Sequence, residues 1–517
     1  MSRRRERRAR PLPLCLTLLV ACALQHVAAQ PRTGAGDAAL ARIEQSIAQG
    51  RLEEAERPLL DYAVAHPKDP RALELLGRLR RLQGRSEEAE ALYRRVLALD
   101  SSRTQAKLNL AHLVHEAGRP DEARALVADA ARTPPTDPRA RLALAEALAL
   151  VGEHRQALAV AETLPSALKN TEALPVVAAA LQALGEGGKL KALVPSMRRA
   201  AVARPGVAAR CAGVLREAGM KEQAVALLRA ALASAPDDAG VLVSLGRLEV
   251  EARDFEQARR HLERAASVAP RSAEALAALA ALEGARGDAA AALVALEKAR
   301  ALSPDSAPLL AQLVVAAMRA NKPGAAVEAA STLLRLKPDE PEYLYLHGAA
   351  LLQGGSMRAA QEALERYARA RPRDSRGCLA LGLALAGQHD RFDAARAQLE
   401  RCLDLDPSNT EAKYQLGLAH RAQGEAAKAV KFLEEVVAAA PEHAGALRDL
   451  GALYAQAGES SKARAALERA ATLDPLDAET HFQLSRLYSR LGEAALAQRH
   501  LEQFQNLKSQ REKVPAP

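Results

Sequence analysis

Glycine recurs along this chain at a spacing of 34 residues, beginning with Gly50, Gly84, Gly118 and Gly152. After one step of 33 the frame continues, and after a one-residue insertion it resumes, so that fourteen copies can be counted. The later positions are Gly185, Gly219, Arg253, Gly287, Asn321, Gly355, His389, Gly424, Gly458 and Gly492. A period of this length indicates a repeat architecture, in which each copy is one small unit that must stack on its neighbours to bury its apolar face.

Two further positions repeat in the same frame. A small residue stands five positions after the glycine, and Leu190 is the one exception; a proline stands seventeen positions after it in most copies. The glycine is expected to end a first helix in the left-handed conformation, and the small residue to let a second helix approach closely. The proline is expected to open the next repeat, within the first turn of a helix.

Composition agrees with short stacked helices. Apolar residues make up 49% of the chain, but aromatic residues make up only 3%, and tryptophan is absent. Ala, Leu, Arg and Glu dominate, and these are helix formers rather than sheet formers. The sequence therefore predicts an all-α fold with many small interfaces.

The thirteenth copy carries the pattern most completely. It holds Leu447, Leu450, Gly451, Tyr454, Gly458, Ala463, Leu467, Ala470 and Pro475. In this spacing the chain resembles the tetratricopeptide repeat proteins, from about Gly36 to Ser509. The resemblance implies a right-handed α-solenoid of about fourteen antiparallel helix pairs. The tryptophan usual near the start of each repeat is always replaced, and the proline is missing at Ser101, Lys169, Val202 and Ser509.

The first 29 residues read as an export signal. Arginines between Arg3 and Arg10 precede an apolar stretch, Leu12–Leu24, and the small residues Val27-Ala28-Ala29 precede Gln30. Leu19-Val20-Ala21-Cys22 also resembles a lipobox, in which Cys22 would be lipidated. We expect an exported bacterial protein, periplasmic or associated with the outer membrane. We favour the soluble route, and the lipoprotein route stays open.

The rest of the chain divides according to how closely each copy matches the repeat pattern. We expect copies 1–4 over residues 36–169, a divergent copy 5 over 170–205, copies 6–14 with a capping helix over 206–509, and a polar tail over 510–517. Between Thr163 and Pro205, Pro165, Pro175, Gly187 and Gly188 shorten or bend helices. We favour a degenerate repeat that still stacks, and a hinge is the alternative.

Charge and cysteine content exclude several functions. Six arginines and one glutamate of the signal account for +5 of the +9 net charge and leave +4 on the rest, so nucleic acid is not an expected partner. Cys211, Cys378 and Cys402 fall at small apolar positions of helices and are expected to be buried. A disulfide between Cys378 and Cys402 stays open as an alternative.

Motifs for chemistry are missing from the sequence. It contains no phosphate-binding Gly-Lys-Ser/Thr loop, no H-E-x-x-H, no C-x-x-C and no G-x-S-x-G. His112 and His115 are three residues apart on one predicted helix, but no acid or cysteine stands at partner spacing, and we interpret them as surface histidines. We therefore expect no enzyme, no metal and no cofactor.

A candidate binding surface follows from the resemblance, which implies that first helices line a concave groove. Aromatic residues occupy the outer groove position of copies ten, twelve and fourteen, and arginines and amides lie near them. The candidate residues are Tyr345, Leu379, Tyr414, Gln415, Arg421, Arg448, Asp449, Phe482, Gln483 and Arg486. Aromatic and Arg side chains dominate binding energy at protein interfaces. The alternative is that the aromatic rings pack between neighbouring first helices.

These observations favour a scaffold of the cell envelope that binds a peptide or helical segment of another protein. The family's chaperone-binding clamp and sugar-transferase ladder are not expected, because the matching position holds Asn109 in the third copy and other residues elsewhere. Membrane contact is expected only through a lipid on Cys22. The alternative function is a structural subunit of a secretion, pilus or polysaccharide-export complex that binds through its convex surface. The sequence leaves the oligomeric state open.

Overall fold

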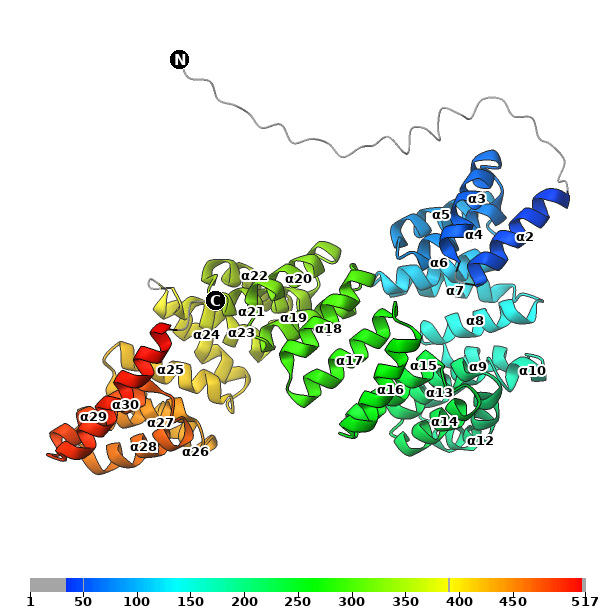
Figure 1. Cartoon of the computed structure of the whole chain (residues 1–517). Coiled ribbons are helices and arrows are strands. Elements are labelled where there is room, and N and C mark those ends of the chain that lie inside the picture. Colours follow the sequence, from blue (N-terminus) through cyan, green and yellow to red (C-terminus); the bar gives the residue numbers. More distant parts are fainter. Residues whose placement is uncertain (1–33, 50, 389–390, 514–517) are drawn as a thin grey trace, which may run out of the picture. The chain divides into compact units, whose positions relative to one another are not determined.

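The computed structural model describes residues 34–49, 51–388 and 391–513, and within them it contains 29 α-helices and no strand (Figure 1). The chain divides into two compact units, residues 1–270 and 271–517. Each unit is a stack of antiparallel helix pairs, which confirms the all-α solenoid predicted from the repeat.

The N-terminal unit contains seven pairs and one extra short helix. Its first helices are α2 (Gly34–Ala48), α4 (Pro70–Leu82), α6 (Thr104–Glu116), α8 (Pro138–Leu150), α11 (Leu174–Ala183), α13 (Pro205–Glu217) and α15 (Ala239–Glu251). Its second helices are α3 (Leu52–Ala65), α5 (Ser86–Leu99), α7 (Pro120–Arg132), α9 (His154–Glu162), α12 (Gly187–Ala203), α14 (Lys221–Ser234) and α16 (Phe255–Val268). The extra helix, α10 (Ser166–Lys169), lies between α9 and α11.

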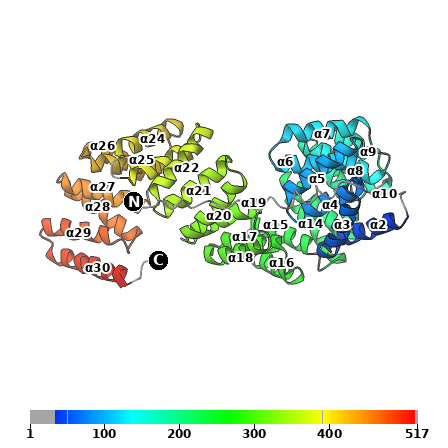
Figure 2. The same cartoon turned by 90° about the horizontal axis from the view of Figure 1, so that it is seen from above.

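The C-terminal unit contains the other seven pairs, which follow one another toward α29 and α30 in Figure 2. Its first helices are α17 (Ala273–Arg286), α19 (Ala307–Arg319), α21 (Pro341–Gln353), α23 (Ser375–Ala386), α25 (Thr410–Ala422), α27 (Ala444–Gln456) and α29 (Ala478–Arg490). Its second helices are α18 (Ala289–Leu302), α20 (Pro323–Leu336), α22 (Met357–Ala370), α24 (Phe392–Leu405), α26 (Ala426–Ala439), α28 (Ser460–Leu473) and α30 (Ala494–Lys513).

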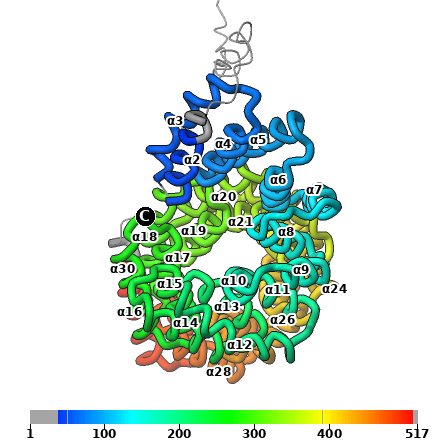
Figure 3. Tube along the Cα trace, turned by 90° about the vertical axis from the view of Figure 1, so that its right-hand side faces the viewer, coloured from blue at the N-terminus to red at the C-terminus, as the bar shows by residue number. Residues whose placement is uncertain are grey.

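The first helices lie together on one side of each stack. Successive first helices contact one another, as α6 contacts α8, α13 contacts α15, and α21 contacts α23. In Figure 3, α6, α8, α13 and α15 follow the inner side of the curve of the N-terminal unit, and α7, α9, α14 and α16 follow its outer side. The inner face of a unit is therefore built from first-helix side chains.

The turn inside each pair has the conformation that the repeat predicts. The described glycines of the frame have φ between 73° and 90°, as at Gly185 and Gly287. Arg253 and Asn321, which replace glycine in the same frame, also have positive φ, of 61° and 53°. The register of the turns is thus confirmed even where glycine is absent, because the backbone geometry of the pair demands a left-handed residue there.

Close packing of the two helices of a pair depends on small residues from both. The predicted alanines are buried, as at Ala89 and Ala258, and so is the exceptional Leu190. Glycines of first helices add to this closeness, since a Cβ on Gly246 would lie 2.5 Å from Leu262 Cγ. Each pair therefore buries a small Ala/Leu interface, as the composition predicts.

The prediction for the recurring proline was wrong in its position. Pro236 and Pro338 lie in the turn between one pair and the next, three residues before α15 and α21 begin. The helix is instead capped by a later polar residue, as where the Asp238 side chain accepts a hydrogen bond from Val241 N. The proline ends the preceding second helix rather than opening the first helix.

The divergent fifth copy is continuous with its neighbours in the apolar core. Leu142 of α8 and Val176 of α11 belong to one buried cluster, and Leu181 and Met197 belong to another that extends to Leu245 of α15. Its second helix, α12, holds Pro195 in its interior. The hinge alternative stays a prediction that local stability measurements can address.

The two ends of the chain differ in how far the structure describes them. The predicted signal over residues 1–29, with Cys22, lies outside the described residues. At the other end, α30 continues to Lys513, four residues beyond the predicted end at Ser509, because Gln, Arg, Glu and Lys are good helix formers. No helix in the described ranges has the length and apolar character to span a membrane.

Candidate functional surface

Tyr345 and Leu379 line an apolar hollow of about 430 Å³ on the C-terminal unit. The hollow crosses three successive first helices, α19, α21 and α23. Its other lining residues are Met318, Arg319, Ala349, Leu352, Gln353, Arg376, Ala380 and Leu383. We call it the apolar hollow. Two predicted groove residues from adjacent repeats are thus brought together on the inner face, where an apolar side chain of a partner can be buried.

Arg376 forms one wall of the apolar hollow and is held in place by its neighbours. Its guanidinium lies 4.9 Å from the centre of the Tyr345 ring and 3.1 Å from Glu342 Oε1. It also pairs with Asp374 at 2.8 Å, and hydrogen bonds from Arg376 lower the pKa of Asp374 to about 2. These contacts orient the Tyr345 ring and fix this wall of the hollow.

Tyr414, Arg421, Arg448 and Asp449 form a second group, on α25 and α27. The buried Asp449 carboxylate accepts hydrogen bonds from the Tyr414 hydroxyl at 2.9 Å, from Arg448 Nη2 at 3.2 Å and from Arg421 Nη1. Arg448 also reaches Asp477 before α29, at 3.1 Å. This group, here called the Asp449 network, links three successive repeats.

Burial and the nearby Asp449 carboxylate raise the pKa of Tyr414 to about 12, so its hydroxyl stays a hydrogen-bond donor across the neutral range. The ring also stacks at a tilt on His443, with 4.6 Å between ring centres. These contacts lie within the stack. At this position the structure has the ring packed between neighbouring repeats, which is the alternative that the sequence left open.

The remaining candidates lie on α29 and α25. The Phe482 ring contacts Phe504 of α30 with 5.2 Å between ring centres, and the Arg486 guanidinium lies 5.7 Å from the Phe482 ring centre. Gln415 and Gln483 each donate to a glutamate one turn earlier, Glu411 and Glu479. The ten predicted residues therefore occupy three local groups on the inner side of the unit.

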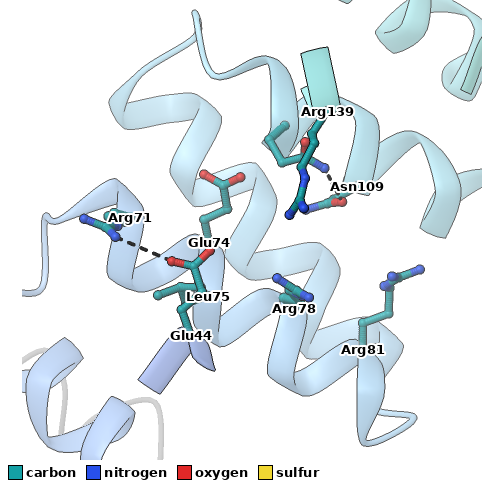
Figure 4. Close-up of a pocket in the computed structure, with 9 residues that line it drawn as sticks. Glu44, Arg71, Glu74, Leu75, Arg78, Arg81, Asn109 and Arg139 are labelled. Atoms are coloured by element: carbon teal, nitrogen blue, oxygen red, sulfur yellow. Dashed lines mark hydrogen bonds and ion pairs between the residues drawn. The ribbon is translucent and has the colours of Figure 1, made fainter. Parts of the chain in front are cut away.

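The N-terminal unit has a larger hollow of about 530 Å³, and its lining is charged (Figure 4). Its residues come from α2, α4, α6 and α8. They are Glu44, Arg71, Glu74, Leu75, Arg78, Arg81, Gln105, Asn109 and Arg139. We call it the basic hollow. The sequence pointed to Asn109 and not to the arginines. Arg71 and Arg139 share one repeat position, but Gln105 interrupts it in the copy between them, and Arg78 and Arg81 stand at two other positions.

His112 and His115 are half-buried on α6 rather than on the surface. Burial, and secondarily the positive charge of Arg81, lower the pKa of His112, which keeps that ring neutral at pH 7. In the ranges that the structure describes, no three His, Cys, Asp or Glu side chains lie close enough together to hold a metal ion.

Comparison with known proteins gives a consistent family match. Two family models, both described as tetratricopeptide repeat, match the chain. The first covers residues 81–140, 215–282, 285–350 and 420–479, and the second covers residues 35–104 and 379–444. No curated protein matches.

Similar solved structures include three proteins of low identity. One is the APC/C hetero-tetramer Cut9-Hcn1, 13% identical over 91% of this chain and 99% of its own, with a TM-score of 0.41. Another is YrrB, described as a TPR protein with an unusual peptide-binding site, 17% identical over 36% of this chain and 95% of its own, with a TM-score of 0.33. A third is MamA from Desulfovibrio magneticus RS-1, 23% identical over 33% of this chain and 96% of its own, with a TM-score of 0.30.

Proposed function

Because the chain belongs to the tetratricopeptide repeat family, we propose that it is a non-catalytic scaffold that holds other proteins, and that a partner segment binds in the apolar hollow. The observation that carries the proposal is the hollow itself, in which Tyr345 and Leu379 of adjacent first helices meet. A segment laid across α19, α21 and α23 can bury an apolar side chain there. Arg319 in its lining can donate to the segment's backbone, and the side-chain oxygen of Gln353 can accept from it.

The experiment places a photo-crosslinking amino acid on either face of the same unit. In one chain it replaces Leu379 in the apolar hollow; in the control it replaces Val294, an exposed residue of the second helix α18. We expect a discrete crosslinked partner from the first position only. A crosslink from Val294 alone would favour the convex-surface alternative. Crosslinks from neither position would contradict a scaffold role for this unit.

A matched pair of truncations measures the contribution of the hollow. Leu379→Ala removes apolar surface from the hollow, and Val294→Ala removes it from the exposed face of the second helix α18. We expect the first change to weaken capture of the crosslinked partner by about tenfold, since the few residues that dominate an interface lie near its centre and cost about 2 kcal/mol or more when truncated. Equal capture by both variants, with unchanged melting, would remove the hollow from the binding site.

We further propose that the chain is exported to the bacterial envelope. The proposal rests on the basic and apolar pattern of residues 1–29. Mass spectrometry of the protein from a bacterial host should find an N-terminus at Gln30 or a lipidated Cys22, and Cys22→Ser separates the two routes. A retained Met1 in the cytoplasmic fraction would contradict export.

A further inference from the structure

The basic hollow carries positive charges that have no partner among the residues that the structure describes. Its two acids are both paired: Glu44 lies 3.5 Å from Arg71, and Glu74 lies 3.6 Å from Arg103. The guanidinium groups of Arg78, Arg81 and Arg139 make no ion pair or hydrogen bond with any residue that the structure describes. Three unneutralised arginines therefore face one hollow.

The contrast is with Arg80, which is buried on the same helix as Arg78 and Arg81 and has a counter-charge. Arg80 pairs with Glu56 at 2.5 Å, and Arg94 with Glu90 at 2.9 Å. In contrast, Arg81 Nε is buried and has no acceptor among the described residues, and Arg78 is half-buried. Partly burying a cation without a counter-charge costs free energy, which an anionic ligand recovers.

The arrangement of the three arginines indicates the form of the ligand. Arg78 and Arg81 project from α4, whereas Arg139 lies in the first turn of α8, and α6 comes between these helices in the stack. Figure 4 shows Arg78 and Arg139 approaching the open space from different helices, with Asn109 of α6 beside Arg139. A hollow that crosses several repeats suits an extended chain with several anionic groups better than one small ion.

The remaining lining residues indicate the chemistry of that chain. Guanidinium forks match carboxylates in geometry, and the amides of Gln105 and Asn109 can bond a peptide backbone. Leu75 offers an apolar contact that a sugar-phosphate backbone does not use. These features favour a peptide of mixed acidic and apolar character over a nucleic acid.

We propose that the basic hollow binds an acidic segment of a partner protein, with its Asp and Glu side chains accepting hydrogen bonds from Arg78, Arg81 and Arg139. The inference rests on the proposed scaffold function and specifies the chemistry of one partner segment. It concerns the N-terminal unit, so it is separable from binding at the apolar hollow of the C-terminal unit.

The test uses the full chain and a fluorescein-labelled peptide of the sequence Glu-Asp-Leu-Glu-Glu-Leu-Asp-Glu. Its C-terminus is amidated, so that only side-chain carboxylates can bind. The control peptide has Gln and Asn in place of every Glu and Asp. Fluorescence anisotropy should show at least about tenfold tighter binding of the acidic peptide, and this difference should shrink as salt screens the charges. Equal binding of the two peptides would overturn the proposal.

Matched variants locate the binding. A triple variant should bind the acidic peptide about tenfold more weakly than the unchanged chain does. Its changes are Arg78→Gln, Arg81→Gln and Arg139→Gln. The control changes three exposed arginines of second helices in the same unit, Arg57→Gln, Arg155→Gln and Arg198→Gln, and should bind as the unchanged chain does. An equal loss in both variants would show nonspecific attraction and overturn the proposal.

Two further measurements keep the test decisive. If the triple variant melts early, the exposed Arg139→Gln alone should still weaken binding, by about threefold. A single-stranded oligonucleotide that binds more tightly than the peptide, and is lost with the same arginines, would replace the peptide as partner class. Crosslinking at Leu379 is measured in the same chains, because it does not depend on the basic hollow. If crosslinking persists while the acidic peptide fails to bind, this inference fails and the scaffold function stands.

Discussion

The hydroxyl of Tyr414 on α25 donates a hydrogen bond to the carboxylate of Asp449 on α27 across 2.9 Å. The two residues are 35 positions apart, one repeat plus one residue, and each stands on the first helix of its repeat. The ring and its hydroxyl therefore join neighbouring repeats. A residue type that often anchors partners serves here to fix the spacing of the stack.

Asp449→Asn should destabilise the end of the C-terminal unit. The substitution keeps the shape but leaves Arg421 without its buried counter-charge and Arg448 with Asp477 alone, and we expect a loss of about 2 kcal/mol. Hydrogen exchange of the α25–α29 amides in native buffer measures the change locally. The matched control is Asp404→Asn, an exposed residue of α24, which should change exchange by less than about 0.5 kcal/mol. Equal protection in both variants would contradict a stabilising role for the Asp449 network.

The repeat frame predicted the helix pairs, the left-handed turns and the buried small residues because each is a local requirement that recurs in every copy. Contacts between copies were less predictable. Arg421 pairs with Asp449, which is 28 positions later in the sequence. Whether such a side chain pairs within the stack or stays available to a partner depends on how far one repeat is shifted against the next. The basic hollow was missed for a related reason, since Arg78 and Arg139 occupy unlike positions of their repeats and meet only after stacking.

The three described cysteines should be free and slow to react in the native protein. The Cys378 and Cys402 thiols are 3.2 and 3.4 Å from the same acceptor, the Ser375 carbonyl oxygen. Burial raises the pKa of Cys211 to about 12, and burial together with Cys378 raises that of Cys402 to about 12. Thiolate is the reactive form, so alkylation at pH 8 should be strongly suppressed at Cys211 and Cys402 until urea is added. Peptide mapping after alkylation measures this at each site, and a peptide linked through Cys378 and Cys402 without reductant would contradict it.

The contact between α29 and α30 should weaken in mild acid. His481 Nε2 lies 3.0 Å from the Pro475 carbonyl and therefore donates to it, so His481 Nδ1 accepts the proton of His500 Nδ1, also 3.0 Å away. Burial, His481 and Arg499 lower the pKa of His500, whereas Gln503 and Glu468 act in the opposite direction. The folded state thus favours the neutral ring. Its contribution to stability is present above the ordinary pKa of about 6.5 and is lost as pH falls through the lower folded value.

A ring that cannot be protonated provides the comparison for this pH effect. His500→Phe keeps an aromatic ring beside Tyr488, whose ring centre lies 5.6 Å from that of His500. Limited proteolysis of α30 at pH 7.5 and pH 5.5 should show a larger increase in cleavage for the unchanged chain than for this variant. A parallel increase in both would assign the acid sensitivity to other groups, such as His347, whose pKa burial also lowers.

Two turns that lack glycine offer a direct measurement of backbone strain. Arg253 and Asn321 have φ of 61° and 53°, a region that costs most L-residues about 1–2 kcal/mol but that Asn tolerates better. Arg253→Gly should therefore stabilise the N-terminal unit by about 0.5–1 kcal/mol, after the greater freedom of glycine in the unfolded chain is deducted. Asn321→Gly should change stability little, because the Asn321 side chain also lies 3.5 Å from Gln353 Nε2. The reverse change, Gly219→Ala, should cost about 1 kcal/mol through the backbone alone, since a Cβ there would meet no atom within 4 Å. Urea denaturation of the three variants measures the order of their free energies of unfolding. If Arg253→Gly is destabilising, the Arg253 side chain contributes more to stability than its strained backbone costs.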